Sequence, residues 1–239
     1  MRVVVVGLRA TGAAASGWLR ARGDEVTVVE ERPGQPEYQE RRDAAEAAGI
    51  TVIEGAPDWV ALMSATDLLV PSPGVRPSHP AMIAARAAKV PIRGDLDLAV
   101  AAATVPVVVV TGTNGKSTVT TLISAMLERT GVRAPAIGNI GRVALDALAD
   151  PADVLVIEAS SFQLFTVTSS FAPRVAVVLN LADDHLIGTA NFDLVAILGA
   201  EQHPIAHLRA AHVLAQCNNL RPYQSLGDLG CRRNEDAAS

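Results

Sequence analysis

The chemistry most clearly indicated by this 239-residue sequence is phosphate binding by a glycine-rich loop. The strand-like run from Val105 to Val110 is followed by Thr111-Gly-Thr-Asn-Gly-Lys-Ser-Thr118 and then by a helical pattern to about Arg129. Glycines let backbone N–H groups converge on phosphate oxygens, and the N-terminus of the next helix adds its dipole. We expect Lys116 to neutralise the β- and γ-phosphates of a nucleotide and the Ser117 hydroxyl to ligate Mg²⁺. The predicted phosphate contacts are Gly112, Thr113, Asn114, Gly115, Lys116, Ser117 and Thr118.

The alternative interpretation of this loop is an ordinary strand–turn–helix joint. The full pattern G-x-x-x-x-G-K-[ST] requires glycine at position 110, where the chain has Val110. Lys116, however, is one of only two lysines in the chain, the other being Lys89. Chance placement of a lysine at this position is therefore the less favoured explanation.

Acidic side chains follow the two later strands of the pattern. Glu158 ends the hydrophobic run 153–158, and Asp183-Asp-His185 directly follows the run 174–180. The carboxyl ends of parallel strands open onto the ligand crevice of such sheets, where a carboxylate can hold Mg²⁺ or orient a reacting group. The alternatives are a solvent-facing acid for Glu158 and a surface turn capped by aspartate for the later cluster.

A second cradle is indicated near the start of the chain. Gly7-Leu-Arg-Ala-Thr-Gly12 follows the run 2–6 and opens a helix, and Glu30 ends the next strand, where an acid can bind ribose hydroxyls. The middle glycine of the dinucleotide fingerprint is Arg9, so we expect a nucleotide or sugar-phosphate cradle rather than an NAD site. The alternative is a βα turn without a ligand.

The elements that position these residues follow the pattern of an α/β protein with parallel sheets. Short β-branched runs alternate with Ala- and Leu-rich segments, which is typical of βα units. We expect a Rossmann-like domain over 1–95 and an ATP-binding domain over 96–239, joined by a helix at 96–103. The pattern weakens after about residue 185. The expected strands are 2–6, 25–30, 50–54, 67–70, 105–110, 153–158 and 174–180, and the clearest early helices are 11–22 and 39–48.

Composition excludes several classes of function. A net charge of −5 argues against bulk electrostatic binding to nucleic acid or to an anionic membrane. No apolar run approaches the ~18–20 residues of a transmembrane helix, so we expect no membrane insertion. Only two cysteines occur, and Met1 and a single arginine lead into a valine run without a cleavage-site pattern. These features favour a cytoplasmic protein.

Other polar groups allow more than one interpretation from the residues alone. Gly138-Asn-Ile-Gly141 and Ser160-Ser-Phe-Gln163 are turn residues as readily as ligands. His203 and His207 are four apart, a spacing that could bind a metal but more often belongs to a satisfied helix face.

Taken in order, the motifs resemble those of the Mur ligase family. The resemblance covers about residues 1–185, and its most specific strings are E-x-S-S-F-Q-L and G-N-I-G. It is carried by Gly7-Leu-Arg-Ala-Thr-Gly12, Ser72-Pro-Gly-Val75, Gly94-Asp-Leu-Asp-Leu98, Thr111-Gly-Thr-Asn-Gly-Lys-Ser-Thr118, Gly138-Asn-Ile-Gly141, Glu158-Ala-Ser-Ser-Phe-Gln-Leu164 and Asn180-Leu-Ala-Asp-Asp-His185.

The resemblance implies an ATP- and Mg²⁺-dependent amide ligase of peptidoglycan synthesis. Within the family, the motifs are closest to those of members that join D-glutamate to UDP-N-acetylmuramoyl-L-alanine through an acyl phosphate. It implies catalytic roles for Lys116, Glu158 and His185, with Ser117, Glu158 and His185 as metal ligands. The implied substrate contacts are Thr11, Glu30 and Gly74 around the uridine nucleotide, and Asn139, Ser160 and Gln163 around the muramoyl group.

The chain departs from the family pattern after His185. Family members carry a later lysine that is carbamylated to bridge two metals, whereas no lysine follows Lys116 here. An aspartate and an aromatic residue are replaced by Leu186-Ile-Gly188, and no segment corresponds to the family's third domain. We expect a C-terminally truncated ligase, and a shifted reading frame or premature stop after Leu186 would account for the change. The alternatives are a catalytically silent nucleotide- or UDP-sugar-binding module and, less favoured, a different P-loop NTPase.

Overall fold

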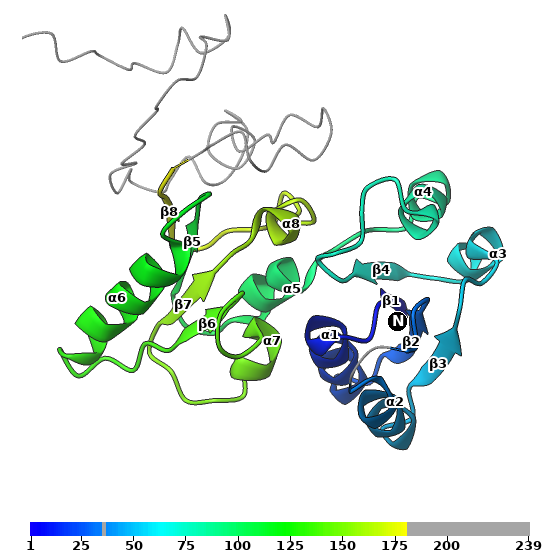
Figure 1. Cartoon of the computed structure of the whole chain (residues 1–239), viewed down its shortest axis with the longest axis horizontal. Coiled ribbons are helices and arrows are strands. Elements are labelled where there is room, and N and C mark those ends of the chain that lie inside the picture. Colours follow the sequence, from blue (N-terminus) through cyan, green and yellow to red (C-terminus); the bar gives the residue numbers. More distant parts are fainter. Residues whose placement is uncertain (35–36, 181–239) are drawn as a thin grey trace, which may run out of the picture.

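The computed structural model describes residues 1–34 and 37–180, which form two α/β units (Figure 1). Each unit is built on a four-stranded sheet whose strands all run parallel. The predicted α/β class with parallel sheets is therefore confirmed. In the part of the chain that is described, no helix is long and apolar enough to cross a membrane.

The first sheet has the strand order β3-β2-β1-β4. Val3 to Val6 of β1 are all buried, as expected for a central parallel strand covered on both faces. The order reverses between β1 and β4, and ligands of such sheets bind at this reversal, outside the carboxyl ends of the strands. The elements are β1 (Arg2–Val6), α1 (Ala10–Ala21), β2 (Glu25–Glu30), α2 (Tyr38–Ala47), β3 (Thr51–Glu54), α3 (Trp59–Ser64), β4 (Leu68–Pro71) and α4 (Pro80–Ala87).

The second sheet has the strand order β6-β7-β5-β8, so β5 lies between β7 and β8. The loop after β5 therefore lies between the carboxyl ends of β7 and β8. Strand β6 was not predicted, because three residues without a β-branched run give little signal. The elements are α5 (Asp95–Ala102), β5 (Val107–Thr111), α6 (Lys116–Glu128), β6 (Ala136–Gly138), α7 (Ala144–Ala147), β7 (Leu155–Glu158), α8 (Ser161–Leu164) and β8 (Val175–Val178).

Helix α5 joins the two units into one core. It contacts α1 of the first unit and α7 and α8 of the second, and Figure 1 shows it between the two sheets. Leu96 and Ala99 of this helix are fully buried and belong to a hydrophobic cluster that extends from Val3 to Phe171. Because this cluster crosses from one sheet to the other, it holds the two units in a fixed relation.

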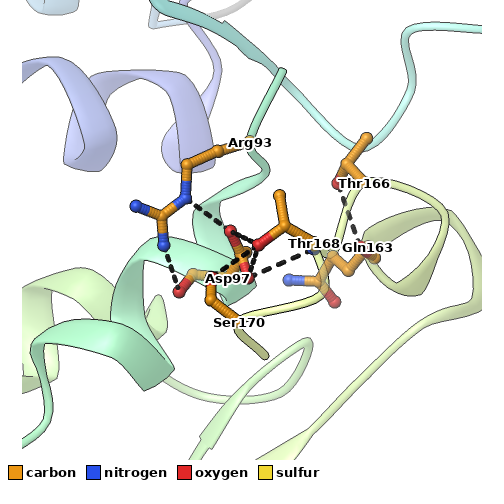
Figure 2. A network of polar contacts seen from close by, with 6 residues as sticks. All are labelled: Arg93, Asp97, Gln163, Thr166, Thr168 and Ser170. Atoms are coloured by element: carbon orange, nitrogen blue, oxygen red, sulfur yellow. Dashed lines mark hydrogen bonds and ion pairs between the residues drawn. The ribbon is translucent and has the colours of Figure 1, made fainter. Parts of the chain in front are cut away.

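A buried polar network reinforces this junction (Figure 2). The Asp97 carboxylate has no exposed surface and accepts hydrogen bonds from Arg93 Nε (2.5 Å) and from Thr168 Oγ1 (3.1 Å). Gly94 N–H donates to the Thr166 carbonyl, and a Cβ on Gly94 would lie 2.0 Å from Thr166 Oγ1. Burying a charged group costs free energy unless the group is paired and hydrogen-bonded. Arg93 and Thr168 therefore stabilise the Asp97 carboxylate in its buried position.

Two glycines of α1 give a matched test of how closely this helix packs against the loop that follows β1. A Cβ on Gly12 would lie 1.9 Å from the Gly7 carbonyl oxygen, whereas one on exposed Gly17 would meet no atom within 4 Å. We expect Gly12→Ala to lower the free energy of unfolding by roughly 1–3 kcal/mol or more through overpacking. Gly17→Ala should instead raise it by up to about 1 kcal/mol, since alanine favours a helix interior.

Denaturant titration of the two variants measures this contrast. Equal stabilities for Gly12→Ala and Gly17→Ala would contradict the close packing of α1 on the loop that follows β1.

Candidate functional site

The glycine-rich loop after β5 has the backbone shape that the sequence predicted. Gly112 and Gly115 have φ values of +142° and +83°, in the region that favours glycine. Helix α6 begins at Lys116, and the Lys116 ammonium donates to the carbonyls of Gly112 (2.9 Å) and Thr113 (3.1 Å). The first-turn N–H groups of a helix lack intrahelical partners, so those of Lys116, Ser117 and Thr118 face the loop's open end. Ser117 and Thr118 are both exposed there.

Glu158 lies beside this loop at the end of β7. The strand register pairs it with Val110, and the Thr111 hydroxyl donates to the Ala159 carbonyl at 3.0 Å. The Glu158 side chain is only 2% exposed. Its Oε1 accepts from Asn139 Nδ2 at 2.8 Å, while its Oε2 is buried and bonds no described atom.

The unpaired oxygen of Glu158 fits a metal ligand. Buried polar atoms in proteins are almost always satisfied, and carboxylate oxygens are what Mg²⁺ prefers. The residues present therefore suit Mg²⁺, with Glu158 and the hydroxyl of Ser117 as the described groups that would hold it. No group of three or more His, Cys, Asp or Glu side chains within residues 1–34 and 37–180 is placed to bind a metal.

Asn139 reaches Glu158 because Gly138 has no side chain. Gly138 has a φ of +101°, and a Cβ there would lie 2.5 Å from the Glu158 carbonyl oxygen. The Asn139 backbone N–H donates to that same carbonyl at 2.9 Å. The main chain and the side chain of Asn139 are thus both fixed against Glu158.

Asn139 also lines a cavity of about 700 Å³ at the carboxyl ends of the first sheet. Thr11, Glu30 and Gly74 line the same cavity. The structure thus brings together four of the six residues predicted to contact the substrate. Through Asn139, this cavity adjoins the Glu158 carboxylate and hence the phosphate-type loop.

Backbone groups hold the Glu30 carboxylate in this cavity. Glu30 is 8% exposed, and its two oxygens accept from the N–H groups of Leu8 (2.7 Å) and Arg32 (2.9 Å). The carboxylate thereby closes the glycine loop onto the end of β2, and its remaining lone pairs can accept hydrogen bonds from hydroxyl groups.

The charges around the cavity favour an anionic ligand. Arg9, Arg32 and Arg76 line it, and arginine suits phosphate oxygens. The acidic Glu31 on the same wall accepts from His79 Nε2 at 3.0 Å. His79 Nδ1 accepts from the Ala81 N–H, so Nε2 carries the proton of the neutral ring and donates to Glu31.

Ser160 and Gln163 lie apart from the cavity, in the turn that follows Glu158. They form a capping box at the start of α8: Ser160 Oγ accepts from the Gln163 N–H, and Gln163 Oε1 accepts from the Ser160 N–H. Gln163 is 4% exposed, and its Nε2 donates to Asp95 Oδ2 at 2.9 Å. Its amide is therefore engaged inside the protein. Ser160 is half-buried, and its hydroxyl also donates to Gln163 Oε1 at 3.1 Å.

The remaining predicted residues are not placed by the structure. His185, Asp183 and Asp184 lie outside the described residues, as do His203 and His207. Asn180, the first residue of the motif Asn180-Leu-Ala-Asp-Asp-His185, contacts the glycine loop through its side chain. Its position at the end of a strand was visible in the sequence, but its role depended on β8 pairing with β5.

The fold and this site define an α/β protein with a phosphate-type loop and a second, anion-suited cavity. Residues 1–94 match the family description "Mur ligase MurD-like, N-terminal domain", and residues 110–196 match "Mur ligase middle domain". The chain belongs to the Mur ligase family and carries its N-terminal and middle domains, as the motifs predicted.

Curated relatives agree with this assignment. The UDP-N-acetylmuramoylalanine--D-glutamate ligase of Escherichia coli (strain K12) is 39% identical over 184 residues, which are 77% of this chain and 40% of that protein. The ligase of the same name from Marinobacter nauticus is 40% identical over 185 residues, 77% of this chain and 41% of that protein. The chain thus spans about two fifths of the length of these relatives.

A solved structure shares the fold. The UDP-N-acetylmuramate:L-alanyl-gamma-D-glutamyl-meso-diaminopimelate ligase from Neisseria meningitides matches with a TM-score of 0.50 at 21% identity. The match covers 77% of this chain and 61% of that one.

Asp95, which accepts a hydrogen bond from Gln163, makes the stability of the protein depend on pH in a specific way. Its side chain is 1% exposed, and burial raises the pKa of this carboxyl above its usual value. The folded state therefore binds the Asp95 proton more tightly than the unfolded state does. The resulting stability is fully present below the usual aspartate pKa and is lost as pH rises through the raised one. Relative to Asp95→Asn, the parent chain should be more stable at about pH 4 than at about pH 7.

Asp153→Asn is the control of opposite sign. The exposed Arg133 guanidinium lowers the pKa of Asp153 to about 2, so the contribution of that carboxylate is present at neutral pH and lost on acidification. Denaturant titrations at both pH values measure these differences. A parallel pH dependence of the two variants would refute the burial of a titrating Asp95.

Proposed function

We propose that the chain takes part in ATP-dependent amide formation between UDP-N-acetylmuramoyl-L-alanine and D-glutamate, in the cytoplasm. The observation that carries the proposal is the Asn139–Glu158 hydrogen bond, which connects the cavity of the first unit to the phosphate-type loop of the second. The names of the curated relatives support the choice of substrates. The low cysteine content favours the location.

The proposed reaction has two steps, formation of an acyl phosphate and its attack by an amine. A carboxylate oxygen of the L-alanyl group attacks the γ-phosphorus of ATP, the bond to the bridging oxygen breaks, and ADP leaves. The amine of D-glutamate then attacks the acyl carbon, phosphate leaves, and the amine gives up a proton. Bringing a carboxylate to a triphosphate joins like charges, so catalysis depends on positioning and on positive charge.

We assign each of the site residues a part in holding these reactants. Lys116 and the first-turn N–H groups of α6 would bind the phosphates, and Ser117 and Glu158 would hold Mg²⁺, which offsets phosphate charge when bound. Thr11, Glu30 and Gly74 would hold the uridine nucleotide, with Asn139 between the two sites. Ser160 would position the muramoyl group, and Gln163 would act through Ser160. His185, outside the described residues, is proposed as a further metal ligand.

The second candidate is a binding module without turnover. No lysine follows Lys116 anywhere in the sequence, although the family resemblance implies one that bridges two metals. Such a module would bind MgATP and the UDP-linked substrate but form no amide.

Phosphate release by the full chain distinguishes the two candidates. A ligase releases phosphate from ATP only when UDP-N-acetylmuramoyl-L-alanine and D-glutamate are both present. Lys116→Ala should lower this rate at least about 100-fold, because it removes a charge aimed at the phosphates. Lys89→Ala, which changes the only other lysine, should leave the rate unchanged. No release, with both nucleotides still bound, would support the module and contradict the ligase.

Glu158→Gln tests the proposed metal site separately. The amide keeps the shape of the side chain but lacks the charge that the unpaired oxygen offers to Mg²⁺. We expect the gain in ATP affinity on adding Mg²⁺ to fall roughly tenfold or more, measured by isothermal titration with Mg²⁺ and with a chelator. Glu128→Gln, on the exposed end of α6, is the control. An unchanged Mg²⁺ dependence in Glu158→Gln would refute the metal site.

A further inference from the structure

Asn180 lies against the glycine loop because of the strand order of the second sheet. The register pairs Thr111 of β5 with Val178 of β8, and Asn180 follows two residues later. The backbone pairing continues beyond the strand ends: Leu179 N–H donates to the Thr111 carbonyl, and Thr113 N–H donates to the Asn180 carbonyl, both at 3.0 Å. The segment after β8 thus runs along the first half of the loop.

The Asn180 side chain then pairs with one residue of the loop at two points. Its Oδ1 accepts from the Asn114 N–H at 2.8 Å, and its Nδ2 donates to the Asn114 carbonyl at 2.9 Å. An N–H can bond only to the amide oxygen and a carbonyl only to the amide NH₂, so these partners fix the orientation of the amide. The side chain contacts Asn114 as a neighbouring strand would.

Gly112 permits this close approach. With a φ of +142°, it has a conformation that side chains rarely adopt, and a Cβ there would lie 3.1 Å from both the N and the O of Asn180. The requirement for glycine at 112 therefore comes from the segment after β8 as well as from the shape of the loop itself.

The contacts of Asn180 leave a defined set of loop donors for a ligand. Thr113 and Asn114 donate their N–H groups to Asn180, so these groups lie on the β8 side of the loop. The Lys116 ammonium lies over the carbonyls of Gly112 and Thr113. The first-turn N–H groups of α6 and the ammonium are therefore among the donors that remain for a ligand.

We propose that Asn180 is a positioning residue of the nucleotide site. It holds the loop in its phosphate-binding shape before nucleotide arrives, so binding does not have to order the loop. The inference rests on the proposed function for its ligand, MgATP, and adds a residue that acts on the loop from the neighbouring strand.

The test uses the full chain with the variants Asn180→Ala and Asn180→Asp. Alanine removes both side-chain hydrogen bonds, while aspartate keeps an acceptor for the Asn114 N–H but places a carboxylate against the Asn114 carbonyl. Hydrogen exchange of residues 111–118 without nucleotide should become faster in both variants, because both lose the donor to the Asn114 carbonyl and alanine also loses the acceptor for the Asn114 N–H. MgATP affinity, measured by isothermal titration, should fall roughly tenfold or more.

Binding of UDP is the internal control, because its proposed cavity includes Asn139 but not Asn180. A positioning role predicts that the variants keep their UDP affinity and lose MgATP affinity. Unchanged exchange and unchanged MgATP affinity would overturn the inference, and so would an equal loss of both ligands. If the parent chain itself binds no MgATP, the proposed function fails, and the exchange rates alone then decide whether Asn180 holds the loop.

Discussion

The site of this molecule depends on one partly buried hydrogen bond, from Asn139 Nδ2 to Oε1 of the buried Glu158. It is possible only because Gly138 lets the Asn139 backbone approach the end of β7. The bond uses one oxygen of the carboxylate and leaves the other buried and unpaired beside the glycine loop. A group that would be costly as an isolated charge thus becomes a site for a cation.

The fold brings this contact to the cavity of the first unit by packing the two sheets together. Both sheets direct the carboxyl ends of their strands towards ligand cradles, and α5 packs the sheets into one hydrophobic cluster. The Arg93–Asp97–Thr168 network adds a polar contact at the same junction. Asn139 and Glu158 both belong to the second unit, so a shift between the two units would leave their hydrogen bond intact but would separate Asn139 from the cavity of the first unit. Rigidity at α5 is therefore a requirement of the site.

Local patterns were enough to predict the loops but not their neighbours. The valine run, the glycines and Lys116 lie within one stretch of sequence, so the strand–loop–helix arrangement was readable directly. Glu30 and Glu158 were found because each ends a strand. The place of Asn180 required knowing that β5 pairs with β8, which is a long-range choice that no local pattern contains. Gln163 was expected to contact substrate. Its hydrogen bond to Asp95 was not predicted, because it depends on packing between segments that are distant in the sequence.

The central claim is that the two cradles form one site that meets at Asn139 and Glu158. Isothermal titration of MgATP into the full chain, with and without saturating UDP-N-acetylmuramoyl-L-alanine, tests it most directly. The account predicts that each ligand changes the affinity of the other by the same factor, and that Asn139→Ala removes this coupling. If the parent chain binds MgATP with the same affinity whether or not UDP-N-acetylmuramoyl-L-alanine is present, the claim is contradicted.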